Sequence, residues 1–177
     1  MNFYRTRFAC IDPGLRGCGV SVFFEGEVEK AAYVKNPVET GEGFTAYTVM
    51  ATAVSDYLLG HSYDKLIIEH PRVYPGSAQQ KGDLNDLLSV VAVGSAIAAT
   101  LVSSAYYYGD IETVYPSDWK GNTPKEVMTD RIRRALASEE LSAMAPCAAS
   151  LKHNVYDAIG IGLWKLKRIN QRVIHNE

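Results

Sequence analysis

The sequence predicts an α/β protein built on a mixed five-stranded sheet with helices on both faces. Short apolar runs predict strands at 8–11, 19–24, 27–34, 64–69 and 112–115. Helical spacing of apolar residues predicts helices at 44–59, 83–107 and 124–137, and from 151 or 153 to about 171. The first three strands follow one another closely, which favours antiparallel pairing, whereas the last two follow helices, which favours parallel pairing. A mixed sheet results.

Local signals set the boundaries of these elements. The glycine-rich turn at 14–18 joins the first two strands in a hairpin, and Gly60 marks the end of the first helix. Acidic residues from Asp83 onward suit the start of the second helix. Thr123 is expected to cap the third helix, with Pro124 in its first turn.

Composition describes one ordinary domain spanning residues 1–177. Hydrophobic residues make up 47% of the chain and charged residues 21%, so the chain can bury a core. Three cysteines without paired ligand spacing predict neither a disulfide framework nor a zinc site. Cys10 and Cys18 are expected to pack as small apolar side chains in a reducing compartment. We therefore expect a cytoplasmic protein.

The overall charge argues against a protein that coats nucleic acid, because the net charge is −2 and the pI is near 6.1. Basic residues nevertheless gather in two sets, which are Lys120, Lys125, Arg131, Arg133 and Arg134, and then Lys165, Lys167, Arg168 and Arg172. Each set could be a DNA-binding patch or a solvated helix face. If DNA binds, metal ions and a local basic patch must offset the acidic remainder.

One segment is long enough to cross a membrane, because residues 87–108 carry no formal charge. Small and polar residues interrupt this run, and acids rather than Lys or Arg flank it at Asp83, Asp86 and Asp110. The pattern favours a buried helix packed against a sheet or a second subunit. No membrane partner is expected.

Three acidic residues lie where a metal-dependent nuclease needs ligands. Asp12 ends the first strand before Pro13-Gly14, Glu69 ends the fourth strand before Pro71, and Asp157 lies near the start of the last helix. Adjacent carboxylates raise each other's pKa unless a cation lies between them. Mg²⁺ prefers such oxygen ligands, and two ions roughly 3.5–4 Å apart can activate a water and stabilise a leaving oxygen. The alternative for each acid is a solvated strand or helix end.

Four sequence blocks in a fixed order extend over nearly the whole chain. They are Ile11-Asp12-Pro13-Gly14 with Gly17 and Gly19, then Leu66 to Pro71, then Tyr115 through Trp119-Lys120-Gly121 to Lys125, and then His153 to Ala158. Asp-x-Gly alone is a weak signal, but the ordered set resembles the RuvC-like Holliday junction resolvases of the ribonuclease H-like superfamily. In texture it resembles their bacteriophage branch, which would place the protein in the cytoplasm of a bacterial host.

The resemblance implies a ribonuclease H-like sheet and a homodimeric endonuclease that uses two Mg²⁺ ions, with Mn²⁺ as a substitute. Asp12 would bridge both ions, and Glu69 and Asp157 would complete the set. The family places an Asp or His three positions before the last acid, where this chain has Asn154 beside His153. Either residue could ligate a metal or orient a water, and this departure concerns catalytic strength rather than the fold.

The resemblance also implies contacts with branched DNA. In the loop after Glu69, Tyr74 would stack on an unpaired base, which is worth about 1–3 kcal/mol, and Arg72 would contact phosphate. The alternative for Tyr74 is a surface ring packed on a neighbouring proline. Lys120 and Lys125 would lie near the scissile phosphate, where Lys125 would count among the catalytic residues.

Other assignments concern packing. The helix at 83–107 resembles the family's dimer helix, and its small residues would allow close approach of a second copy. Trp119 is expected to buttress its loop rather than contact DNA. Trp164 and Phe44 are expected to lie in the core.

The leading hypothesis is an endonuclease that nicks Holliday junctions during DNA recombination and leaves 5′-phosphate products. A nuclease of the same fold could instead trim flaps or debranch DNA. A junction-binding module with weak or absent catalysis is the alternative from a different class, and a metal-dependent cleavage assay distinguishes it. An ATP-binding fold of the sugar-kinase type also uses Asp-x-Gly, but it needs a second lobe for which this chain is too short.

Overall fold

A computed structural model of the protein describes residues 6–39, 42–72, 83–104 and 107–169. Five strands form one sheet in the order β3-β2-β1-β4-β5. The strands are β1 (Arg7–Asp12), β2 (Gly17–Phe24), β3 (Glu27–Lys35), β4 (Tyr63–Glu69) and β5 (Tyr107–Val114). β1, β2 and β3 pair antiparallel, whereas β4 pairs in parallel with both β1 and β5. The mixed five-stranded sheet is therefore confirmed.

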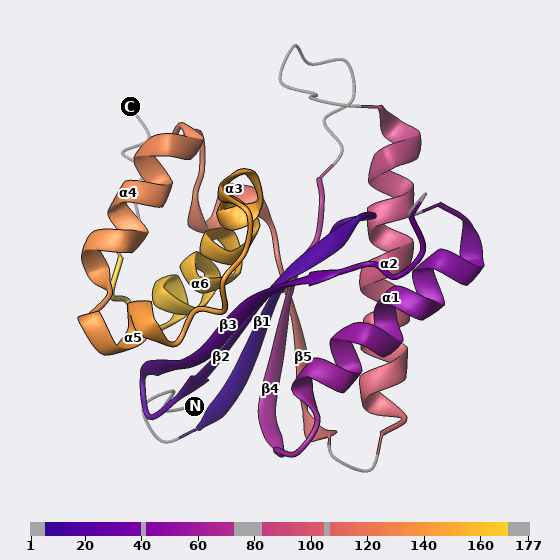
Figure 1. Ribbon diagram of the computed structural model, residues 1–177, viewed down its shortest axis with the longest axis horizontal. Helices are drawn as coiled ribbons and strands as arrows, with labels where there is room; N and C mark the ends of the chain where they lie inside the picture. Colours follow the sequence, from indigo (N-terminus) through magenta and orange to yellow (C-terminus); the bar gives the residue numbers. More distant parts are fainter. Residues whose placement is uncertain (1–5, 40–41, 73–82, 105–106, 170–177) are drawn as a thin grey trace.

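Helices cover both faces of this sheet, as predicted (Figure 1). The helices α1 (Gly43–Leu58) and α2 (Leu84–Val102) lie on one face. The other face carries the short helix α3 (Pro116–Trp119), α4 (Lys125–Ala135), α5 (Ser138–Ser142) and α6 (Lys152–Lys165), which the 3₁₀ turn η2 (Ala149–Leu151) precedes.

The central strand β1 contributes to two hydrophobic cores because its side chains alternate between the two faces. Phe8 and Cys10 belong to the cluster beneath α4 and α6, whereas Ala9 and Ile11 belong to the cluster beneath α1 and α2. All four side chains are fully buried. A strand covered on both faces reads in sequence as an unbroken apolar run, which is why β1 was predictable.

Several predicted boundaries were wrong at helix ends. The second helix ends at Val102 rather than 107, and β5 begins at Tyr107 rather than 112, because one uncharged run continues from the helix into the strand. The last helix ends at Lys165 rather than near 171. Lys167 adopts a left-handed backbone with φ of 59°, and the Arg168 N–H donates to the Leu163 carbonyl, which closes the helix end.

Two side-chain predictions were also wrong. Thr123 does not cap the third helix, because Pro124 is the N-cap residue and makes no side-chain cap bond. Phe44 is not in the core: it is 85% exposed at the start of α1, and its ring makes an edge-type contact with Tyr47. Trp164 does pack against the core of the α6 face, as predicted.

The approach of α6 to β2 depends on Gly19. A methyl group at Gly19 would lie 1.9 Å from the backbone oxygen of Asn154, a distance that no side-chain adjustment can relieve. The Ser21 hydroxyl, on the same strand, donates to the Ala158 carbonyl at 2.9 Å. This close contact fixes the part of α6 that carries Asn154 and Asp157 over the sheet.

We predict that Gly19→Ala lowers the free energy of unfolding by roughly 3 kcal/mol, because overpacking against backbone forces α6 away from the sheet. Urea denaturation of the purified variant measures this change. Gly94→Ala is the matched control, because its added methyl group would meet neighbours at an ordinary 3.6 Å. A Gly19→Ala variant as stable as Gly94→Ala would contradict the assigned contact.

Candidate active site

The sheet topology brings the first two predicted acids together. Asp12 and Glu69 are the last residues of β1 and β4, and these parallel neighbours are in register at Ile11 and Ile68. Their side chains therefore emerge side by side at the carboxyl edge of the sheet. Asp157 reaches the same edge from α6, which packs against β1 and β2.

Lys120 joins two of these carboxylates. Its Nζ lies 3.1 Å from Asp157 Oδ2 and 3.4 Å from Glu69 Oε2. Burial lowers the pKa of Lys120, but Glu69, Asp157 and Asp12 outweigh burial, so the pKa is raised overall. The ammonium therefore stays charged at neutral pH and occupies the space between the two acids.

The site concentrates negative charge. Burial raises the pKa of Asp12 well above its ordinary value, and the charges of Glu69 and Asp157 raise it further against the opposing effect of Lys120 and Lys125. Burial also raises the pKa of Glu69, although Lys120 and a hydrogen bond from Trp119 oppose it. Three carboxylates thus face one close ammonium, and the site favours any additional cation.

Trp119 holds Glu69 in place. The Trp119 Nε1–H donates to Glu69 Oε2 at 2.6 Å, and both side chains are buried. The sequence predicted a packing role for Trp119 but missed this hydrogen bond. No sequence signal joins the two residues, because they lie 50 positions apart and meet only in the fold.

An open cavity of about 920 Å³ leads to the site. Asp12, Asp157, His153 and Asn154 line one part of it, and Pro13, Met128 and residues between Pro116 and Lys125 line the rest. The predicted residues His153, Asn154 and Lys125 are therefore beside the carboxylates. Burial lowers the pKa of His153, and the nearby Lys125 lowers it further.

Arg72 and Tyr74 are the two residues predicted to contact DNA in the loop after Glu69. Tyr74 lies outside the described residues. Arg72 lies with His70, Pro71 and Tyr115 around a small pocket beyond Glu69, where its guanidinium is 5.6 Å from the centre of the Tyr115 ring. Sequence reasoning missed this Tyr115 contact.

Much of the second basic set is occupied by ion pairs within the protein. Lys165 pairs with Glu112, and Arg168 pairs with the buried Glu140.

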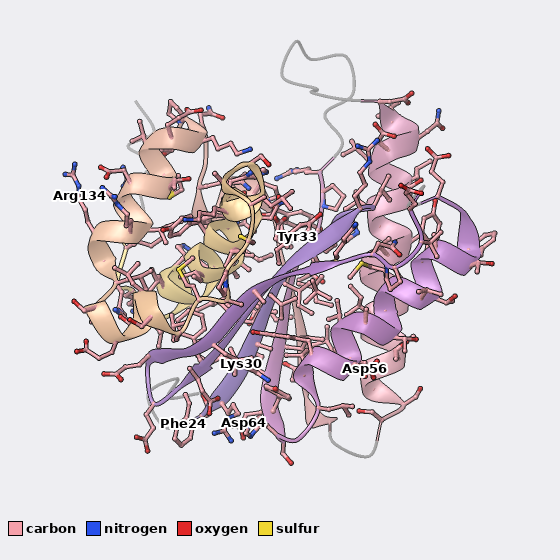
Figure 2. The ribbon with its side chains drawn as sticks, viewed as in Figure 1. Phe24, Lys30, Tyr33, Asp56, Asp64 and Arg134 are labelled. Carbon is pink, nitrogen blue, oxygen red and sulfur yellow. The ribbon has the colours of Figure 1, made fainter. Side chains whose placement is uncertain are left out.

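Part of the first basic set is paired as well. On α4, Arg133 and Arg134 pair with Asp130, and Arg134 points outward from the helix in Figure 2. The basic groups that line the cavity are Lys120 and Lys125.

The donor chemistry fits a hard divalent cation. Asp12, Glu69 and Asp157 offer carboxylate oxygens, and Asn154 offers an amide oxygen beside them. Across the described part of the chain, no three His, Cys, Asp or Glu side chains are close enough to hold a metal as they stand. The Lys120 ammonium lies between Glu69 and Asp157, within 3.4 Å of an oxygen of each. A cation would replace the ammonium.

No protein-family model matches the chain, and no curated protein matches its sequence. The structure of T. thermophilus RuvC in complex with a Holliday junction substrate is similar, with a TM-score of 0.58 and 16% identity over 94% of this chain and 98% of that chain. A second Thermus thermophilus RuvC structure has a TM-score of 0.49 and 16% identity, over 89% of this chain and 91% of that one. The yeast mitochondrial Holliday junction resolvase Ydc2 also has 0.49, with 12% identity over 93% and 80%. The chain therefore has the RuvC-like fold.

We predict that Lys120→Met lowers the free energy of unfolding in EDTA by about 2–3 kcal/mol. This is less than the loss of a fully buried pair, because Lys120 is partly exposed. Thermal denaturation at neutral pH measures the change. Lys125→Met is the matched control, with a loss under about 0.5 kcal/mol expected at this exposed position. Equal melting temperatures for the two variants would show that Lys120 does not compensate the acids.

Proposed function

We propose that the protein is a metal-dependent, structure-selective endonuclease that nicks branched DNA, with Holliday junctions as the leading substrate. The supporting observation is that Asp12 and Asp157 line one open cavity on a RuvC-like fold, with Glu69 joined to Asp157 through the Lys120 ammonium. The T. thermophilus RuvC structure named above is of a complex with a Holliday junction substrate. The same arrangement of acids favours an enzyme over a junction-binding module, because a binding surface for phosphates gains nothing from buried carboxylates.

The residues of the site would have distinct roles in metal binding and phosphate contact. Asp12, Glu69, Asp157 and Asn154 would hold Mg²⁺, or Mn²⁺ as a substitute, with His153 as a second candidate for ligating or orienting a water. The bound ions would supply an activated water and stabilisation of the leaving oxygen. Lys120 and Lys125 would contact the scissile phosphate across the cavity and stabilise negative charge there. The product nick would carry a 5′ phosphate.

We further propose that the protein acts as a homodimer through α2. Of its 19 residues, α2 buries only Val93, Gly94, Ile97 and Leu101. Leu88 is 65% exposed, and Leu84 and Val102 are also exposed. This helix is also long and apolar enough to cross a membrane by length and composition alone. A second copy is the better occupant, because paired nicks require two sites and α2 packs against the catalytic sheet.

Assignment to a bacteriophage, and hence to the cytoplasm of a bacterial host, rests on sequence texture and stays a proposal. The flap-trimming and debranching alternatives use the same carboxylates. They differ in the DNA shape that is cut, so the choice among them needs substrates of different shape.

We predict that Asp12→Asn reduces the cutting of a labelled four-way junction by about 1000-fold or more, since several kcal/mol of transition-state stabilisation are lost. Junction binding in EDTA should be retained. The assay compares four-way, Y-shaped and linear DNA with Mg²⁺, Mn²⁺ or EDTA.

The control for this assay is Asp56→Asn, an exposed acid on α1 (Figure 2), which should cut like the natural protein. If the natural protein binds the junction but does not cut it with either metal, the nuclease proposal is wrong and only the junction-binding alternative remains. If Asp12→Asn cuts the junction as fast as the natural protein, Asp12 is not a catalytic residue.

We predict that Leu88→Lys converts the dimer to a monomer, because a charge replaces an exposed apolar anchor. Light scattering after size-exclusion chromatography measures the mass. Val127→Lys, at an apolar position on α4 that is also more than half exposed, should leave the dimer intact. A natural protein that is monomeric at micromolar concentration, or that requires detergent to stay in solution, would contradict dimerisation through α2.

A further inference from the structure

Trp119 is held rigidly between α3, α4 and α6. It ends α3 and is only 4% exposed. A methyl group at Gly160 of α6 would lie 2.5 Å from Trp119 Cζ3 and 2.7 Å from Ile132 Cδ1 of α4, so the glycine provides the space in which the indole packs. The ring therefore has a fixed position relative to the helix that carries Asp157.

The indole N–H of Trp119 points toward the Glu69 carboxylate. The indole Nε1–H donates to Glu69 Oε2 at 2.6 Å, a short charge-assisted bond in a buried setting. The face of the same ring contacts Lys120, whose Nζ lies 4.7 Å from the ring centre. Trp119 thus touches both the acid that a cation would bind and the ammonium that a cation would replace.

We propose that Trp119 is a positioning residue of the cation site, one that fixes the orientation of the Glu69 carboxylate. This inference rests on the proposed function, because it assumes that Glu69 binds a divalent cation. A carboxylate held by an indole N–H on Oε2 loses its freedom to rotate, and both of its oxygens then lie near the Lys120 ammonium, with Nζ 3.4 Å from Oε2 and 3.5 Å from Oε1. Partners of this kind raise metal affinity because the ligand does not have to be ordered on binding.

The first test measures Mn²⁺ affinity by titration calorimetry without DNA. Trp119→Phe keeps an aromatic ring in the space at Gly160 but removes the N–H donor. We expect Mn²⁺ binding about 10-fold to 100-fold weaker than in the natural protein. Thermal denaturation of the same sample confirms that the variant is folded.

Trp164→Phe is the matched control. The Trp164 indole nitrogen is buried and has no hydrogen-bond partner among the described residues. Trp164→Phe therefore also removes an indole N–H, but one that makes no hydrogen bond with any described residue. Mn²⁺ affinity of this variant should equal that of the natural protein.

A second test keeps the Trp119 ring and uses it as the reporter. The chain has two tryptophans, so in Trp164→Phe all indole fluorescence comes from Trp119. Titration with Mg²⁺ should change this emission saturably, because the cation displaces the Lys120 ammonium from the ring face. In Trp119→Phe the remaining Trp164 should give no such change.

The outcomes separate the two proposals. Natural affinity in a folded Trp119→Phe variant, or no saturable emission change in Trp164→Phe, overturns the role of Trp119 and leaves the nuclease intact. A natural protein that binds neither Mn²⁺ nor Mg²⁺ overturns both the metal-dependent nuclease and this inference. Both proposals are supported if Mn²⁺ binding is weakened in Trp119→Phe but not in Trp164→Phe, and if Trp164→Phe shows the saturable emission change.

Discussion

The ion pairs of Lys120 with Glu69 and Asp157 are the interaction on which the site depends. These acids come from a strand and a helix that are far apart in sequence, and Asp12 adds a third carboxylate from β1. Without an opposing charge, these neighbouring carboxylates would repel or take up protons. Lys120 lets them remain together while no metal is bound. The charge balance is incomplete, because one close ammonium opposes three carboxylates. A divalent cation offers more charge to the same oxygens, so its binding would release Lys120 toward the cavity, where a phosphate would be its natural partner.

The close packing of α6 on the sheet provides the geometry for these ion pairs. Gly19 lets α6 approach β2, Gly160 provides the space for Trp119, and a methyl group at Gly162 would lie 2.1 Å from the Phe23 ring. Each glycine removes a side chain where two elements meet closely. Asp157 therefore reaches the strand ends without a long side chain or a flexible loop. A site built on strands and a helix keeps its ligands in place better than one carried by loops.

The sequence predicted the parts of this structure that depend on local pattern. Strand β1 was recognisable because both of its faces are buried, and the positions of Asp12 and Glu69 followed from the turn residues after them. The end of α2 was not predictable, because the sequence continues into β5 with no charged residue, Gly or Pro before Gly109. Phe44 was misplaced because apolar spacing within a helix does not show whether its first turn is covered by other elements, and Phe44 is exposed. The Trp119–Glu69 bond and the position of Lys120 between two acids are tertiary facts, which no spacing within the chain encodes.

The inner face of α2 joins the proposed dimer surface to the site. A methyl group at Gly94 would lie 3.6 Å from both Pro13 and Ile68, the neighbours in sequence of Asp12 and Glu69. The outer face of the same helix carries the exposed Leu84, Leu88 and Val102. A second copy bound to that outer face would hold two such helices, and through their inner faces two pairs of catalytic strands, in one rigid assembly. The distance between the two sites would then be set by helix packing rather than by the DNA. A fixed distance of this kind lets an enzyme select a branched substrate by shape while reading little of its sequence.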